Sequence, residues 1–282
     1  LSIHNGNMTD TIRYEVNMQW KEKDNLHSLV KIDRITPVYI NNSEVEYVAA
    51  ELALQVSSTL YPLILLIDSH GTYAGIGNYT EISKRWLQKK EKIREYYAGE
   101  WTEKYLKLND RIFDSKANLT KCLSDDWFLY AFFNRIHCSY SNNLRVERID
   151  SFPFFLKKKD VDYQVTRTID EYIDNQGYIT VEMEGILVDE RSKTDLEKTV
   201  NFPSHTDSEK ATGAYKGKYI LESKYHTIYA LMLNFSLDLE EKKHVSIVVS
   251  RIRKGDESPA TQEIAPQKKG NLFSRFNKWL NE

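Results

Sequence analysis

The chain of 282 residues contains only two cysteines, Cys122 and Cys138. Both fall in one predicted helix and its exit, too far apart along a continuous helix for a disulfide to close. This excludes a small scaffold held together by disulfides. The sequence also lacks the Cys-x-x-Cys and His-x-x-x-His spacings that are typical of metal sites. We therefore expect both cysteines to be buried small apolar residues and the protein to hold no metal.

Long apolar runs are also missing, and no segment reaches the length that spans a bilayer. The chain begins at Leu1 and not at Met, with no signal-peptide pattern in its first residues. The expected location is the cytoplasm. The alternative is an exported protein whose signal has been removed.

Excess charge of either sign is absent, because the formal net charge is only -2. A protein that binds nucleic acid needs a basic field over its surface, so we expect no nucleic-acid partner. Hydrophobic residues make up 41% of the chain, which is enough for a sizeable core. The 18 tyrosines suit half-buried strand surfaces and, as an alternative, a recognition surface.

The first part of the chain predicts a hairpin followed by a helix. Apolar residues occupy alternate positions over residues 12–20, which predicts a strand with one buried face. A second apolar run, over residues 29–35, predicts its hairpin partner. Residues 44–58 then repeat at helical spacing, and Ser43 is predicted to be the N-cap of that helix.

The stretch from residue 61 to residue 97 organises the chain around it. Residues 63–67 form a short run of branched apolar side chains, which predicts a buried strand. Residues 72–76 predict a second strand that pairs back on the first. Asp68 and His70 are then residues of the turn between the two strands.

Three glycines, Gly71, Gly75 and Gly77, fit the spacing G-x-x-x-G-I-G between this apolar strand and a helix. On these residues the stretch is similar to the nucleotide-binding turn of short-chain dehydrogenases, which implies a dinucleotide at the helix N-terminus. However, no Tyr in the chain is followed four residues later by Lys, which is the family's catalytic pair. The second half of the chain shows hairpins where that family needs alternating strands and helices. We therefore expect no cofactor and interpret the glycines as turn and close-packing residues.

Three helices are predicted next, each with one apolar stripe and one charged face. Asn78 and Glu81 fit a capping box at the start of the first helix, and Gly99 is placed to end it. The second helix carries Trp101, and the third begins near Asn118. Helices with this pattern cover a sheet.

Beyond residue 143 the apolar pattern returns to a period of two and predicts hairpins without intervening helices. The charged residues 189–211 predict a long exposed loop. The expected fold is α+β: a large twisted antiparallel sheet, covered on one face by a block of about three helices. Residues 1–253 are expected to form a single unit. The alternative is a division near residue 150, with strands and the helical block before it and antiparallel strands after it.

The C-terminus combines a predicted flexible linker, residues 254–270, with a predicted amphipathic helix, residues 271–282. Burying its large apolar side chains is worth about 1.5–3 kcal/mol each. Ordering its backbone costs about 1–2 kcal/mol per residue, so the helix needs a surface to pack on. The surface is its own domain, a groove on a protein partner, or a membrane surface favoured by nearby basic residues. The predicted partner-binding residues are Leu272, Phe273, Phe276, Trp279 and Leu280, and the basic residues are Lys268, Lys269, Arg275 and Lys278.

The candidate catalytic groups are Asp68 with His70, Asp125 with Asp126, Glu182 with Glu184, and His137 with Cys138. Each pair is local in sequence, whereas acid–base catalysis needs carboxylates across a cleft and a metal needs converging ligands. We interpret Asp125 as a surface helix residue and Glu182 and Glu184 as the solvent face of a strand. No catalytic residue is assigned.

The sequence thus favours a non-enzymatic binding or assembly protein, which holds a protein partner, itself or another, through its sheet face and C-terminal helix. The alternative is a carrier of a small apolar molecule or lipid, in a cavity lined by aromatic residues between sheet and helices. The third hypothesis is an enzyme whose site is assembled from distant residues.

Overall fold

The structure is a computed structural model of the chain, and it describes residues 1–6, 8–23, 27–45, 47–155, 158–205 and 209–252. Its α+β class with a large antiparallel sheet is as predicted. Ten strands follow the order β6-β5-β2-β1-β14-β13-β12-β11-β10-β9, and a second sheet follows the order β3-β4-β7-β8. The predicted linker and C-terminal helix lie outside the described residues.

The described chain divides into two compact units. The first contains the described residues of 1–9, 125–132 and 136–252, and the second contains those of 10–124 and 133–135.

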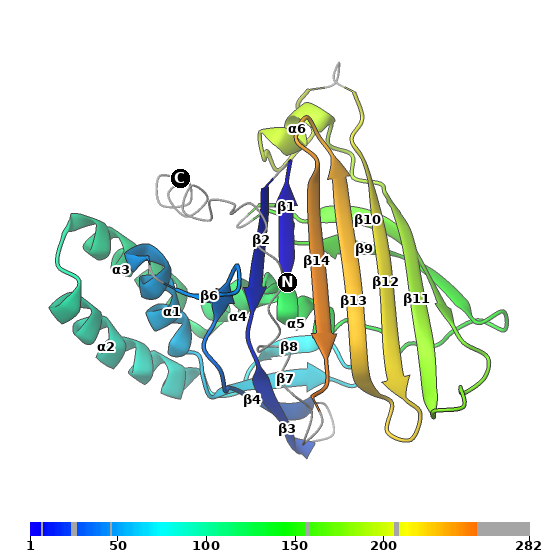
Figure 1. Cartoon of the computed structure of the whole chain (residues 1–282), viewed down its shortest axis with the longest axis horizontal. Coiled ribbons are helices and arrows are strands. Elements are labelled where there is room, and N and C mark those ends of the chain that lie inside the picture. Colours follow the sequence, from blue (N-terminus) through cyan, green and yellow to red (C-terminus); the bar gives the residue numbers. More distant parts are fainter. Residues whose placement is uncertain (7, 24–26, 46, 156–157, 206–208, 253–282) are drawn as a thin grey trace. The chain divides into compact units, whose positions relative to one another are not determined.

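Long antiparallel strands make up most of the first unit (Figure 1). They are β1 (Ser2–Asn5), β9 (Arg145–Phe152), β10 (Val161–Ile169), β11 (Tyr178–Leu187), β12 (Thr212–Glu222), β13 (Thr227–Asp238) and β14 (Lys243–Ser250). In the turn between β10 and β11, Asp174 Oδ1 accepts hydrogen bonds from the backbone N–H groups of Gln176 and Tyr178, each at 2.8 Å. Gly177 adopts a φ of 87° there, a value that favours glycine.

One face of these strands carries a core of aromatic rings. Phe235 is fully buried and stacks on Phe152 at a centroid distance of 3.6 Å and on Tyr215 at 4.4 Å. Burial raises the pKa of the Tyr215 hydroxyl well above its ordinary value. The short helix α5 (Trp127–Phe132) packs on this core, and the Tyr219 hydroxyl donates to the carbonyl of Ala131 at 2.7 Å. The chain's own side chains therefore fill this inner face.

The second unit holds the remaining strands and the helical block. Its strands are β2 (Met8–Arg13, beginning at the end of the first unit), β3 (Val16–Lys23), β4 (His27–Arg34), β5 (Tyr39–Ile40), β6 (Ser43–Glu44), β7 (Leu63–Asp68) and β8 (Tyr73–Ile76). Its helices are α1 (Val48–Ser58), α2 (Tyr79–Tyr96), α3 (Glu100–Phe113) and α4 (Lys116–Ser124). The predicted hairpins are confirmed, since β3 pairs with β4 and β7 with β8.

Two predictions for the first part of the chain are wrong. The strand over residues 12–20 is interrupted, because β2 ends at Arg13 and β3 begins at Val16. At the break, the backbone N–H of Glu15 donates to the Thr36 hydroxyl at 2.8 Å. Ser43 does not cap a helix, because it lies in β6 and α1 begins only at Val48.

The predicted capping box at Asn78 is also wrong. Asn78 is the N-cap residue of α2, but its side chain makes no capping bond. Its Oδ1 accepts from the backbone N–H of Ile64 at 2.9 Å, and its amide donates to the carbonyl of Pro62 at 2.8 Å. The side chain satisfies backbone groups at the start of β7 and so ties the strand to the helix that follows.

The ends of the other predicted helices differ as well. Gly99, with a φ of 137°, is the N-cap of α3, whereas α2 ends at Tyr96. The single third helix is two helices, because α4 ends at Ser124 and α5 begins at Trp127. The Asp126 carboxylate accepts a hydrogen bond from the backbone N–H of Leu129 at 2.8 Å and so caps the start of α5. Asp125 therefore lies at the break between two helices and not on a helix surface.

Candidate functional site

The connection between β11 and β12 is where the structure departs most from the sequence prediction. The predicted exposed loop, residues 189–211, contains the short helix α6 (Lys193–Glu197) and two buried charged side chains, Arg191 and Asp195. The helix begins there because Ser192 and Asp195 form a reciprocal capping box. It lies by the turn between β13 and β14 (Figure 1), where the Glu197 carboxylate accepts from the backbone N–H of Glu240 at 2.7 Å.

Arg191 joins three stretches of backbone. Its guanidinium donates to both oxygens of Asp189, at 2.8 and 2.7 Å, and both side chains are fully buried. The remaining N–H groups donate to the carbonyls of Lys159, Asp160 and Val200, at 3.2, 2.7 and 3.2 Å. Burial raises the pKa of Asp189, but the bonds from Arg191 outweigh it and hold the pKa below its ordinary value. All donors of the guanidinium are thus used within the chain.

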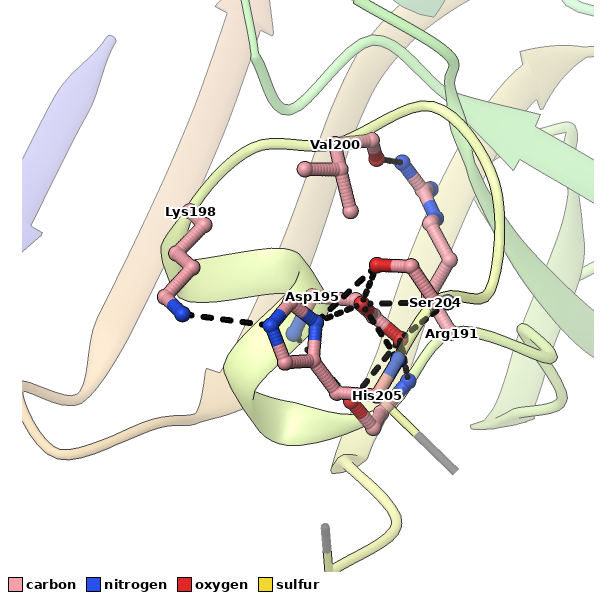
Figure 2. A network of polar contacts seen from close by, with 7 residues as sticks. Arg191, Asp195, Lys198, Val200, Ser204 and His205 are labelled. Atoms are coloured by element: carbon pink, nitrogen blue, oxygen red, sulfur yellow. Dashed lines mark hydrogen bonds and ion pairs between the residues drawn. The ribbon is translucent and has the colours of Figure 1, made fainter. Parts of the chain in front are cut away.

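Asp195 is the centre of a second network, which Figure 2 shows with Ser204 and His205 directed at the carboxylate. The side chains of Ser192 and Ser204 donate to it at 2.8 and 2.7 Å, and His205 Nδ1 lies 2.6 Å from it. Burial raises the pKa of this carboxyl, but the bonds from His205, Ser204 and Ser192 outweigh it and hold the pKa well below its ordinary value. The network thus binds Ser204 and His205, which lie in the later part of the connection, to Asp195 of helix α6.

Ser204, His205 and Asp195 are the residue types of a hydrolase triad, but their arrangement is different. In a triad, the carboxylate and the nucleophile contact opposite nitrogens of the imidazole. Here Asp195 Oδ1 and Ser204 Oγ both lie beside His205 Nδ1, at 2.6 and 3.0 Å. His205 Nε2 lies 3.1 Å from Lys198 Nζ. Because Lys is only a donor, this pairing places the imidazole proton on Nδ1, where it is donated to Asp195. Neither imidazole nitrogen is left to accept the proton of the Ser204 hydroxyl, and the cluster holds the loop together.

The depressed pKa of Asp195 predicts a loss of stability in acid. A carboxyl with a lower pKa when folded stabilises the fold above its unfolded pKa, about 3.9, and loses that contribution as the pH falls toward the folded value. We therefore expect the denaturation midpoint of the wild type to fall steadily below about pH 4. The variant Asp195→Asn is less stable at neutral pH and shows a shallower dependence. The measurement is urea denaturation over this pH range, with Asp238→Asn as the control at a half-exposed aspartate. Equal pH dependence in Asp195→Asn and the wild type would contradict the assignment.

An acidic group lies beside the Arg191 network. Burial, together with the nearby Asp125 and Asp162, raises the pKa of Asp160 to about 6, while Arg191 opposes the shift. Among the described residues, however, no group of three or more His, Cys, Asp or Glu side chains is placed to hold a metal ion. Asp125, Asp160 and Asp162 are thus neighbouring carboxylates that repel one another, and we assign them no ligand.

The other residues that the sequence singles out lie in turns or at partly exposed positions, or outside the described residues. Asp68 Oδ1 accepts from the backbone of His70 and Thr72, each at 2.8 Å, which confirms the turn interpretation. Burial lowers the pKa of His137, with a smaller contribution from His226. Cys122 is exposed and Cys138 is half-buried, so the expected burial of Cys122 is wrong. The predicted partner-binding residues Leu272, Phe273, Phe276, Trp279 and Leu280 lie outside the described residues.

The glycine stretch forms the turn and the second strand of a hairpin, so it does not join β7 directly to α2. Gly71, with a φ of 80°, closes the turn between β7 and β8. Gly77 packs closely, because a Cβ added there would lie 3.0 Å from Ile64 Cγ2. Beside β8, Tyr73 and Ala74 form one wall of an open groove of about 740 Å³, and α4 forms the other with Lys116 and Lys121. The groove opens widely to solvent and encloses no reacting centre.

The sheet of the first unit has a second side, opposite the aromatic core, which we call the outer face. Directly paired residues of antiparallel strands lie on the same face, so the strand register defines its members. They include Ile149, Gln164, Glu182, Glu184, Ile186, Ala214, Lys216, Lys218, Met232 and Val248.

Two features distinguish the outer face from an ordinary wet sheet surface. Four large apolar side chains on it are exposed: Ile149 at 63%, Ile186 at 64%, Met232 at 46% and Val248 at 58%. Between them stand two columns of opposite charge, Glu182 and Glu184 on β11, paired in register with Lys218 and Lys216 on β12. The Lys218 ammonium lies 3.3 Å from the Glu182 carboxylate. The glutamates are at the solvent positions that the sequence predicts.

Comparison of the chain with protein-family models, with curated proteins and with solved structures found no match. Within the part of the chain that the structure describes, no helix combines the length and apolar character needed to cross a membrane.

Proposed function

We propose that this chain is a non-enzymatic binding or assembly protein that holds a protein partner through the outer face of its large sheet. The observation that carries the proposal is the exposure of Ile149, Ile186, Met232 and Val248 on one face, around the charged columns. Exposed apolar residues are ordinary when scattered, whereas apolar residues that adjoin on one face with a polar surround are typical of interaction surfaces, and Met232 and Val248 are directly paired in register.

The polar networks and the core favour this function over the two alternatives. The most organised polar clusters, around Arg191 and Asp195, use their donors and acceptors within the chain. A carrier would need space against the aromatic residues, but Phe235 is stacked between Phe152 and Tyr215 on the inner face. On the outer face, by contrast, the apolar side chains of Ile149, Ile186, Met232 and Val248 stay exposed.

The C-terminal segment supplies a second contact in this proposal. Residues 271–282 carry Leu272, Phe273, Phe276, Trp279 and Leu280 at helical spacing, behind the predicted linker of residues 254–270. A tethered apolar helix raises the effective concentration of its binding surface near a partner that already contacts the outer face. We propose a protein groove as its target and the cytoplasm as the location.

Site-specific photo-cross-linking in the native cell tests the proposal. We expect a photoreactive residue at Ile186 to give a discrete cross-linked protein species, because this position is exposed on the outer face. The same residue at Tyr172 or Tyr225, which are exposed at hairpin ends, should not give that species. Removing residues 271–282 should lower the yield at Ile186 and leave the melting temperature nearly unchanged.

Two results would contradict the proposal. The first is the absence of any protein cross-link at Ile186, together with its absence at Met232 on the same face. The second is an identical set of cross-linked species at Ile186 and at Tyr225, which would show random encounters. A large fall in melting temperature on deletion would show instead that residues 271–282 pack on their own domain.

A further inference from the structure

We infer that the partner of the outer face is a second copy of this chain, stacked face to face across a two-fold axis that runs between β11 and β12. This inference rests on the proposed function, because it names the partner for the same surface. Two observations carry it. One is the order of charges on β11 and β12, and the other is the pairing of Ile186 with Ala214, which lies on the same face next to the charged pairs.

The two charged columns are complementary to themselves. β11 presents Glu182 and Glu184, and β12 presents their register partners Lys218 and Lys216. A two-fold axis in the plane of the interface, parallel to the strands and between them, places β11 of one copy over β12 of the other. Each glutamate then faces a lysine of the second copy, at the same level along the strand. An interface of this kind is isologous, since the contact of one residue with another is repeated in reverse.

The same operation matches side-chain size at the next level. Ile186 on β11 is paired in register with Ala214 on β12. Across the two-fold axis, each exposed isoleucine therefore lies over the small alanine of the other copy. Stacked sheets lie about 10 Å apart, a distance that interdigitating large and small side chains fill.

A second copy fits this face better than an unrelated partner of one charge. A strongly acidic partner would meet the glutamate column with repulsion, and a basic partner would meet the lysine column in the same way. Only a surface with the opposite order of columns matches both, and this chain rotated by 180° has that order. Charge matching of this kind sets register and specificity, and the two Ile186–Ala214 contacts add buried apolar area. The association is therefore expected to weaken as salt is added.

The test is a charge-reversal pair studied with the full-length purified chain. One variant is Glu182→Lys with Glu184→Lys, and the other is Lys216→Glu with Lys218→Glu. Sedimentation velocity at low salt should show a dimer for the wild type. In each variant alone, like charges face each other across the axis, and the dimer dissociation constant should rise on the order of 100-fold or more. An equimolar mixture of the two variants should restore a dimer that contains one copy of each.

A control variant makes the same change in net charge as Glu182→Lys with Glu184→Lys, but at a different surface. Glu95→Lys with Glu100→Lys alters exposed positions at the end of α2 and the start of α3, and it should dimerise like the wild type. Circular dichroism melting checks that every variant folds, which we expect because the altered side chains are exposed and surface pairs contribute little.

Three outcomes would overturn the inference: a monomeric wild type, a dimer that survives both reversals, or a mixture of the two variants that stays monomeric. The cross-linking experiment separates these failures from failure of the proposed function. A cross-link from Ile186 to a different protein, with a monomeric wild type, overturns self-association and leaves the proposed function standing. The absence of any cross-link overturns both.

Discussion

Replacing Arg191 with Met is expected to lower the free energy of unfolding by about 3–5 kcal/mol, which is the usual cost of removing one partner of a buried ion pair. The Asp189 carboxylate would remain in a site where both side chains are fully buried, without the guanidinium that neutralises it. The carbonyls of Lys159, Asp160 and Val200 would also lose the donor that joins them. The measurement is urea denaturation followed by circular dichroism.

Two further variants show whether the buried charge is the cause. The double variant Asp189→Leu with Arg191→Met removes both charges, so it should recover part of the stability that Arg191→Met loses. Arg251→Met changes an arginine that is mostly exposed and lies 3.8 Å from Glu222. Its effect should stay within about 0.5 kcal/mol. A loss below about 1 kcal/mol for Arg191→Met would contradict the role assigned to the network.

The strands could be predicted from the sequence because their signal is local. A period of two in apolar residues follows directly from one buried face, and beyond residue 143 it predicted antiparallel hairpins of the kind that the structure shows. The same rule placed Glu182 and Glu184 at solvent. Their pairing with Lys218 and Lys216 could not be predicted, because register across β11 and β12 depends on a connection of more than twenty residues.

The buried networks were missed for a physical reason. Charged residues are rarely buried unless they are paired, so a run rich in charge predicts an exposed loop. Arg191 is buried because its partners include carbonyls of residues 159 and 160, which are distant in sequence. One local signal was present: Ser192 followed three residues later by Asp195 matches a capping box and could have located α6.

Asn78 illustrates the opposite error. Its sequence context, with Glu81 three residues later, predicts a capping side chain, and the residue does stand at the N-cap of α2. Its amide is used instead by the backbone at Pro62 and Ile64. A local motif gave the correct position of the helix start, but the bonds of the side chain were decided by a strand that only the tertiary structure brings near.

Replacing Phe235 with Ala is the second change with a large expected effect, about 3–5 kcal/mol of unfolding free energy. The ring is fully buried, and it stacks on Phe152 and Tyr215 at 3.6 and 4.4 Å between centroids. Removing the ring opens a cavity among the stacked aromatic side chains. Because their fixed packing gives rise to the near-ultraviolet circular dichroism signal, this signal should also weaken. Phe202→Ala, at a ring that is 77% exposed, is the matched control and should change stability by no more than about 0.5 kcal/mol.

This variant also separates the two faces of the sheet. Phe235 lies on the inner face, whereas its strand neighbours Asn234 and Ser236 are paired in register with the outer-face residues Lys216 and Ala214. If partner binding belongs to the outer face, folded Phe235→Ala protein at low temperature should retain its cross-link at Ile186 and its self-association while it loses stability. If a ligand against the inner rings were the basis of function, binding would fall with the ring. A folded Phe235→Ala variant that no longer associates would therefore contradict the assignment of function to the outer face, because the change removes no side chain from that face.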